Sequence, residues 1–137
     1  MKMIRNLCVL AILVVAPSPC FALWGIVPVS KENAKELGME VRSKSAGPKD
    51  VRVELEFKID DKLKNFSRVD LRFGEGDKMV VAALQEDRSK PGRCVVSFSA
   101  DRSHLDKIAL RVMVPESLGG TAYELRVKDF VELEKAR

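Results

Sequence analysis

The sequence predicts an all-β protein, an antiparallel two-sheet sandwich of immunoglobulin or fibronectin type, with about seven strands and one short N-terminal helix. Three observations support this class. Apolar residues alternate with charged ones along several short stretches, turn-forming residues separate these stretches, and no long helical pattern lies between them. Such short connections favour antiparallel hairpins over parallel crossover units. A closed small barrel is the second architecture that this pattern allows.

Residues 1–22 have the order of a secretory signal peptide. Lys2 and Arg5 precede an apolar run over residues 7–16, and Pro17 breaks this run ahead of the small residue Ala22. The run is too short to cross a bilayer, because a spanning helix needs about 20 apolar residues. We therefore expect cleavage after Ala22, no transmembrane segment in the mature chain, and a secreted or periplasmic location.

Residues 23–38 are predicted to form an N-terminal arm with the short helix. Ser30 is a favourable N-cap residue, and Gly38 is a favourable stop signal after residues 31–37. The apolar start of this arm contains Trp24.

The sandwich domain is predicted to span residues 39–131, followed by a polar tail at 132–137. Its clearest strand is 51–59, where Val, Leu, Phe and Ile alternate with Arg, Glu and Lys. Successive side chains of a strand point to opposite faces, so one face of this strand is apolar and the other is charged. The other predicted strands are 39–43, 69–73, 79–84, 94–98, 108–114 and 123–127.

The charge pattern argues against a nucleic-acid partner. The chain has 24 basic and 20 acidic residues, and two of the basic ones lie in the predicted leader, so the mature chain carries a net charge of +2. Both signs alternate along the same strands, which leaves no basic stripe for a phosphate backbone.

The titratable residues predict no catalytic site, no metal and no cofactor. His104 is the only histidine, and its neighbours Ser103 and Asp106 lie on the same turn, whereas a catalytic triad draws its members from separate elements. Cys94 alternates with Val96 and Phe98, which predicts a buried and unreactive thiol. We therefore expect a protein that is not an enzyme, and a hydrolase is the disfavoured class.

One predicted surface departs from the charged pattern. If Val80 and Ala82 face the core, the alternate residues of the same strand face outward and are apolar, and the following turn makes strand 94–98 a neighbour. The predicted interaction surface consists of Met79, Val81, Ala83 and Val95, with Ala109 and Met113 as possible extensions. The alternative is that the Trp24 segment covers this surface.

The function predicted from these features is a secreted or periplasmic, non-enzymatic binding protein. Its partner would be a protein or an envelope surface component. The alternative is a small-ligand or calcium-binding module that uses carboxylates gathered at one end of the sandwich. These carboxylates belong to Asp60, Asp61, Glu86, Asp87 and Glu116. Basic residues in the same loops, such as Lys62 and Arg88, argue against calcium.

Overall fold

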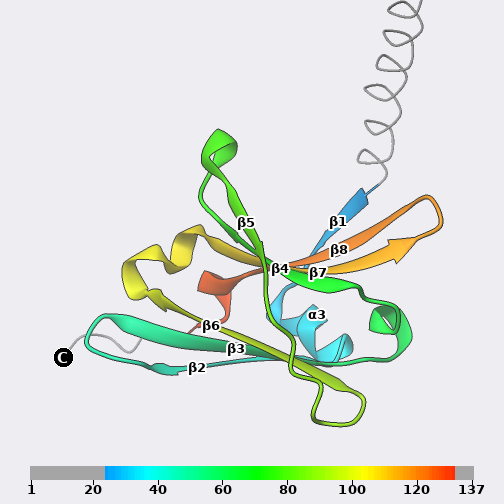
Figure 1. The fold of residues 1–137 in the computed structure, drawn as a ribbon, viewed down its shortest axis with the longest axis horizontal. Coiled ribbons are helices and arrows are strands. Elements are labelled where there is room, and N and C mark those ends of the chain that lie inside the picture. The colour runs from blue at the N-terminus through cyan, green and yellow to red at the C-terminus, as the bar shows by residue number, and fades with distance from the viewer. Residues whose placement is uncertain (1–23, 132–137) are drawn as a thin grey trace, which may run out of the picture.

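The computed structural model describes residues 24–131 as two β-sheets packed face to face (Figure 1). The predicted all-β, two-sheet class is confirmed. The larger sheet has five strands in the order β1-β8-β7-β4-β5, and the smaller has three in the order β2-β3-β6. The predicted signal peptide, residues 1–22, and the predicted tail, residues 132–137, lie outside the described residues.

The described range contains eight strands, one more than the sequence predicted. They are β1 (Trp24–Pro28), β2 (Met39–Ser45), β3 (Asp50–Lys58), β4 (Arg68–Phe73), β5 (Val80–Ala83), β6 (Arg93–Asp101), β7 (Ile108–Glu116) and β8 (Gly119–Arg126). The helices are α3 (Lys31–Glu36) and the short 3-10 turns η1 (Asp61–Leu63), η2 (Gly76–Lys78), η3 (Arg102–Lys107) and η4 (Val127–Asp129). No helix in residues 24–131 has the length and apolar character that a membrane span requires.

Helix α3 begins at the predicted residue, Lys31, and ends at Glu36, one residue before the predicted end. The Ser30 hydroxyl accepts a hydrogen bond from the backbone N–H of Asn33 (3.2 Å), which caps the first turn. The helix stops before Gly38, whose φ of +70° lies in the left-handed region that glycine adopts most easily. The chain then turns directly into β2.

The core lies between the inner faces of the two sheets. Val53, Leu55 and Phe57 alternate along β3 and are fully buried, while Arg52 and Glu54, at the other positions of the alternation, point away from the core. The inner face of the five-stranded sheet supplies Val69, Leu110, Val112 and Leu125. Cys94 and Val96 are 0% and 1% exposed, so the predicted core position of Cys94 is confirmed.

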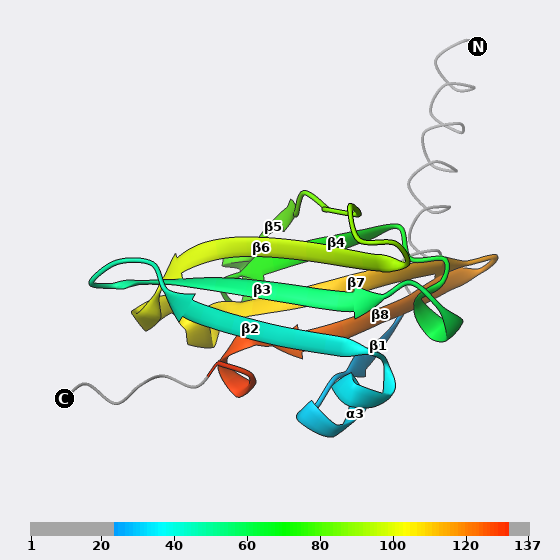
Figure 2. The same ribbon diagram turned by 90° about the horizontal axis from the view of Figure 1, so that it is seen from below.

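Strand β1 extends the five-stranded sheet by pairing in parallel with β8, the last strand of the chain. Figure 2 shows β1 at one edge of this sheet and β5 at the opposite edge. In the register Trp24 lies beside Gly120, and the missing side chain of Gly120 leaves room for the indole ring. Close packing of a tryptophan on a glycine therefore fixes the start of β1 on the sheet.

We expect Gly120→Ala to loosen β1. The added Cβ would lie 2.7 Å from a ring carbon of Trp24 and closer still to the carbonyl oxygen of Val114, so ring or backbone must move. Overpacking of this kind costs about 1–3 kcal/mol of unfolding free energy. Denaturant unfolding should show this loss, and the emission of Trp24, the only tryptophan, should shift to the red.

Gly25→Ala is the matched control, because nothing lies within 4 Å of its added Cβ. This variant should keep the stability and emission of the unsubstituted protein. Equal effects of the two variants would contradict the proposed packing of Trp24 on Gly120.

Candidate interaction surface

The structure separates the four residues of the predicted interaction surface. Strand β5 pairs with β4, and β6 pairs with β3, so Val81 and Ala83 belong to one sheet and Val95 to the other. Met79 precedes β5, at the end of the turn η2. The predicted pairing of these strands is wrong because β5 forms a hairpin with β4, and the connection after β5 crosses to the three-stranded sheet.

The Trp24 segment does not cover β5. It lies at the other edge of the five-stranded sheet, with β8, β7 and β4 between them. Val81 is 48% exposed, and its neighbour Val80 is 61% exposed. Strand β5 is therefore an open edge that bears apolar side chains and no charge, an arrangement that isolated soluble sheets usually avoid.

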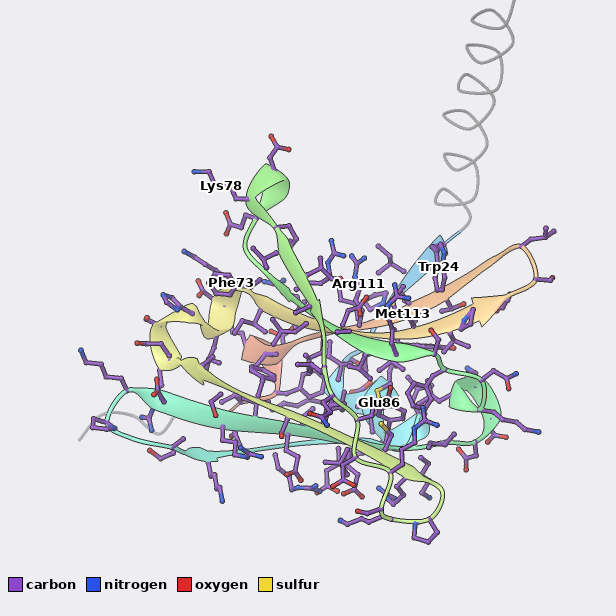
Figure 3. The ribbon with its side chains drawn as sticks, in the orientation of Figure 1. Trp24, Phe73, Lys78, Glu86, Arg111 and Met113 are labelled. Carbon is purple, nitrogen blue, oxygen red and sulfur yellow. The ribbon has the colours of Figure 1, made fainter. Side chains whose placement is uncertain are left out.

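Val81 and Ala83 belong to a larger surface, the outer face of the five-stranded sheet. Residues paired across neighbouring strands share a face, and the alternate residues of β4, β7 and β8 pack in or against the core. Figure 3 labels three members, Trp24, Arg111 and Met113, on the side away from the smaller sheet. The outer face consists of Trp24, Ile26, Arg68, Asp70, Arg72, Val81, Ala83, Ala109, Arg111, Met113, Ala122, Glu124 and Arg126.

Apolar residues occupy both ends of this outer face. At the β1 end, Ile26 is 51% exposed beside Ala122, and Ala122 pairs with Met113, so that the two buried residues form a floor beside an exposed side chain. At the β5 end lie Val81 and Ala83. Ala109 and Met113, which the sequence analysis considered as extensions, share this face.

The charged residues of the outer face are all arginine, aspartate or glutamate, and none of the five strands contains a lysine. Arg68 pairs with buried Asp70 (3.0 Å), and Arg111 pairs with Glu124 (2.9 Å). Arginine, tryptophan and methionine are enriched in protein interfaces, where lysine is depleted. This face therefore shares its arginine, tryptophan and methionine content, and its lack of lysine, with protein interfaces.

The outer face of the three-stranded sheet has a different character, because several of its charges converge on one buried carboxylate. The carboxylate of Glu56, only 5% exposed, accepts hydrogen bonds from Arg42 (3.0 Å), Lys90 (3.1 Å) and Arg93. These bonds, led by the one from Arg42, lower the pKa of Glu56 to about 2, although burial acts in the opposite direction. Arg42 also binds Glu54, and both glutamates raise the pKa of its guanidinium.

The Glu56 cluster has a structural role. Lys90 lies in the connection between β5 and β6, so its bond to Glu56 ties that connection to β3. The same connection adds a bridge between Asp87 and Val95 (2.8 and 2.9 Å), and Arg88 lies 4.5 Å above the ring of Phe66. The crossing between the sheets is therefore held at several points.

The residues with catalytic potential do not converge. The hydroxyl of Ser103 donates to Asp101 (2.8 Å), while the ring of His104 packs edge-on against Phe73. Burial, and then the nearby Glu86 carboxylate, raise the pKa of the Cys94 thiol to about 12, so the reactive thiolate is scarce at neutral pH.

The acidic residues of the calcium alternative are not gathered into a ligand set. Glu86 pairs with Arg88, and Asp87 accepts from the backbone of Ser89. Asp60 and Asp61 line an open cavity of about 430 Å³ between α3 and η1. Three lysines line the same cavity: Lys35, Lys58 and Lys62. Within residues 24–131 no group of three or more histidine, cysteine or acidic side chains is arranged to hold a metal ion.

The sequence analysis missed Arg72, Arg126, Trp24 and Ile26 as parts of one surface. The outward positions of Arg72 and Arg126 could be predicted from the alternation within their strands, whereas the Trp24 segment was not predicted to form a strand. The available signal was the absence of lysine from strands that contain four arginines.

We expect Glu56→Gln to reduce stability at neutral pH by about 1–3 kcal/mol, because three cations lose their charged acceptor. The pH dependence should also change. The pKa of Glu56 is about 2 in the folded protein against an ordinary value of 4.5, so its carboxylate stabilises the fold above pH 4.5. That contribution is lost as the pH falls toward 2. Between pH 4.5 and 2, the free energy of unfolding should therefore fall more steeply with decreasing pH in the unsubstituted protein than in Glu56→Gln.

Glu40→Gln is the control, because Glu40 also pairs with Arg42 but its side chain is 60% exposed. Its effect should stay within about 0.5 kcal/mol. A Glu56→Gln protein as stable as this control at neutral pH would contradict the role of the cluster.

Comparison of the chain with protein-family models, with curated proteins and with solved structures gives no match. The arrangement of the residues themselves is therefore the basis for a function.

Proposed function

We propose that this chain is a secreted or periplasmic, non-enzymatic binding protein whose partner is a protein that docks on the outer face of the five-stranded sheet. The observation that carries the proposal is the contrast between the two outer faces. On one face, Arg42, Lys90 and Arg93 converge on the carboxylate of Glu56, whereas the other exposes Ile26 and Val81 among arginines. Exposed apolar area rimmed by polar residues typically marks an interaction surface.

We further propose that the sandwich is of immunoglobulin or fibronectin type. When β1 is set aside, seven strands remain. The first, second and fifth of them (β2, β3 and β6) form one sheet, and the others (β4, β5, β7 and β8) belong to the second. The central strands of that type divide in the same way, with B and E in one sheet and C, F and G in the other.

The residue chemistry supports a binding role over an enzymatic one. His104 packs on Phe73 with no carboxylate hydrogen-bonded to its ring in the described chain, and Cys94 is buried with a raised pKa. A nucleophile needs a base within hydrogen-bond reach. The thiol of Cys94 donates to the Glu86 carboxylate (3.8 Å), but the raised pKa keeps it in the unreactive thiol form at neutral pH.

Photo-crosslinking tests the proposed face. A photo-reactive amino acid is placed at Ile26 or Val81 on the outer face of the five-stranded sheet, and at Ser97 on the other outer face as the control. In the cells that export the protein, Ile26 and Val81 should give the same crosslinked partner and Ser97 should give none. Crosslinks from Ser97 alone, or none from any position, would overturn the proposal.

The alternative function, a small-ligand or calcium-binding module, is favoured by the cavity between α3 and η1. Its lining carries both signs of charge, from Asp60 and Asp61 and from three lysines, together with the buried Tyr123. Mixed charges suit a polar ligand better than a bare cation, because the lysines repel a divalent ion.

We expect calcium to add no stability. Thermal melts in millimolar calcium and in chelator should coincide, whereas a ligand at 100 times its dissociation constant would add about 2.7 kcal/mol. A rise of several degrees with calcium would shift the assignment to the calcium module.

A further inference from the structure

Resting on the proposed function, we propose that Arg72 and Arg126 form a two-armed site that binds carboxylates of an acidic segment of the partner protein. The two arginines lie in one row across the outer face of the five-stranded sheet. In the register, Arg72 on β4 pairs with Ala109 on β7, and Ala109 pairs with Arg126 on β8.

The row gives the two arginines a fixed separation and open space between them. Neighbouring strands lie about 4.8 Å apart, so the two backbone positions are about 10 Å apart. Ala109 at the centre has the smallest side chain of the row, and Arg126 is exposed. Two guanidinium groups can therefore approach one ligand from both sides of a shallow floor.

These two arginines are the cations of the outer face that no described residue neutralises. Among residues 24–131 neither Arg72 nor Arg126 forms an ion pair or a side-chain hydrogen bond. The acidic residues of the neighbouring row are already engaged, Asp70 by Arg68 and Glu124 by Arg111. The guanidinium groups thus remain available for carboxylates from another molecule, which they can bind through paired hydrogen bonds.

The net charge of the face argues against a second copy as the occupant. Four arginines against Asp70 and Glu124 leave a charge of +2, and two such faces would repel each other. An acidic partner is attracted instead.

The neighbours of the site favour a protein segment over a polyanion. Asp70 and Glu124 in the adjacent row would repel a continuous line of phosphates or sulfates. The row also ends in Val81, which pairs with Arg72 and is 48% exposed. A segment with an apolar residue followed by acidic ones matches the order Val81, Arg72, Ala109, Arg126.

The test uses a fluorescein-labelled peptide with the sequence Gly-Val-Ser-Glu-Ser-Glu-Gly. An extended chain places alternate side chains on one face, so its Val and both Glu residues point together toward the row. The control peptide replaces both Glu residues with Gln. Anisotropy titrations at low salt, up to millimolar protein, should show saturable binding of the acidic peptide only.

Arg72→Gln and Arg126→Gln should each weaken this binding by about tenfold, the loss expected for a charge-assisted pair. Arg52→Gln is the matched control, because Arg52 lies on the other outer face and binds Ser97. Surface substitutions of this kind leave stability within about 0.5 kcal/mol, which the emission of Trp24 and a denaturant titration verify. Unchanged affinity in both arginine variants, or equal binding of the Gln peptide, would overturn the site.

Two further measurements separate the possible failures. Vesicles of phosphatidylglycerol that bind as tightly as the peptide, and lose binding in the same two variants, would overturn the assignment to a protein carboxylate. A variant that combines Arg72→Gln with Arg126→Gln serves for the second measurement. Crosslinking from Val81 that persists in this double variant would overturn the arginine site while the proposed function stands. Absence of crosslinks in the unsubstituted protein would overturn the proposed function itself.

Discussion

The rest of the structure depends on the packing of the two inner sheet faces against each other. The sole cysteine of the described range, Cys94, is a free thiol in this core, so no disulfide bond within that range supports the packing. Side chains alternate strictly along a strand, and a register slip of one residue would turn every core residue outward. Burial of Val53, Leu55 and Phe57 therefore also decides which residues face the solvent. The packing of the core thus determines which residues make up each outer face.

The two outer faces use their charges in opposite ways. On the three-stranded sheet, Glu56 is surrounded by three cations, and the cluster holds the connection that joins the sheets. The attraction within a buried ion pair offsets the cost of desolvation only when further hydrogen bonds satisfy the charged groups. Here the residues around Glu56 supply those hydrogen bonds. On the five-stranded sheet, the ion pairs are local and leave Arg72 and Arg126 unpaired within the described range. The Glu56 cluster stabilises the fold, whereas the two guanidinium groups on the other face support the binding function that we propose.

The sequence predicts most of the elements but not their neighbours. Alternation located β3, β7 and the core position of Cys94, and the Ser30 cap with Gly38 located α3, because these signals are local. Strand pairing depends on contacts between distant segments, so the partner of β5 was misassigned and the pairing of the Trp24 segment with β8 was not foreseen. The same reason explains the missed site. Arg72 and Arg126 come to lie in one row, on either side of Ala109, only when β4, β7 and β8 are placed in order.

The parallel pairing of β1 with β8 joins the earliest strand of the described chain to the latest. During synthesis, β1 leaves the ribosome long before Gly120 and its flanking residues exist, so the five-stranded sheet cannot close until the last strand has emerged. Sheets that rely on such distant contacts fold slowly, and their open edges are exposed to aggregation in the meantime. A molecule that binds the apolar β1 segment until β8 has emerged would shield it from aggregation during that interval.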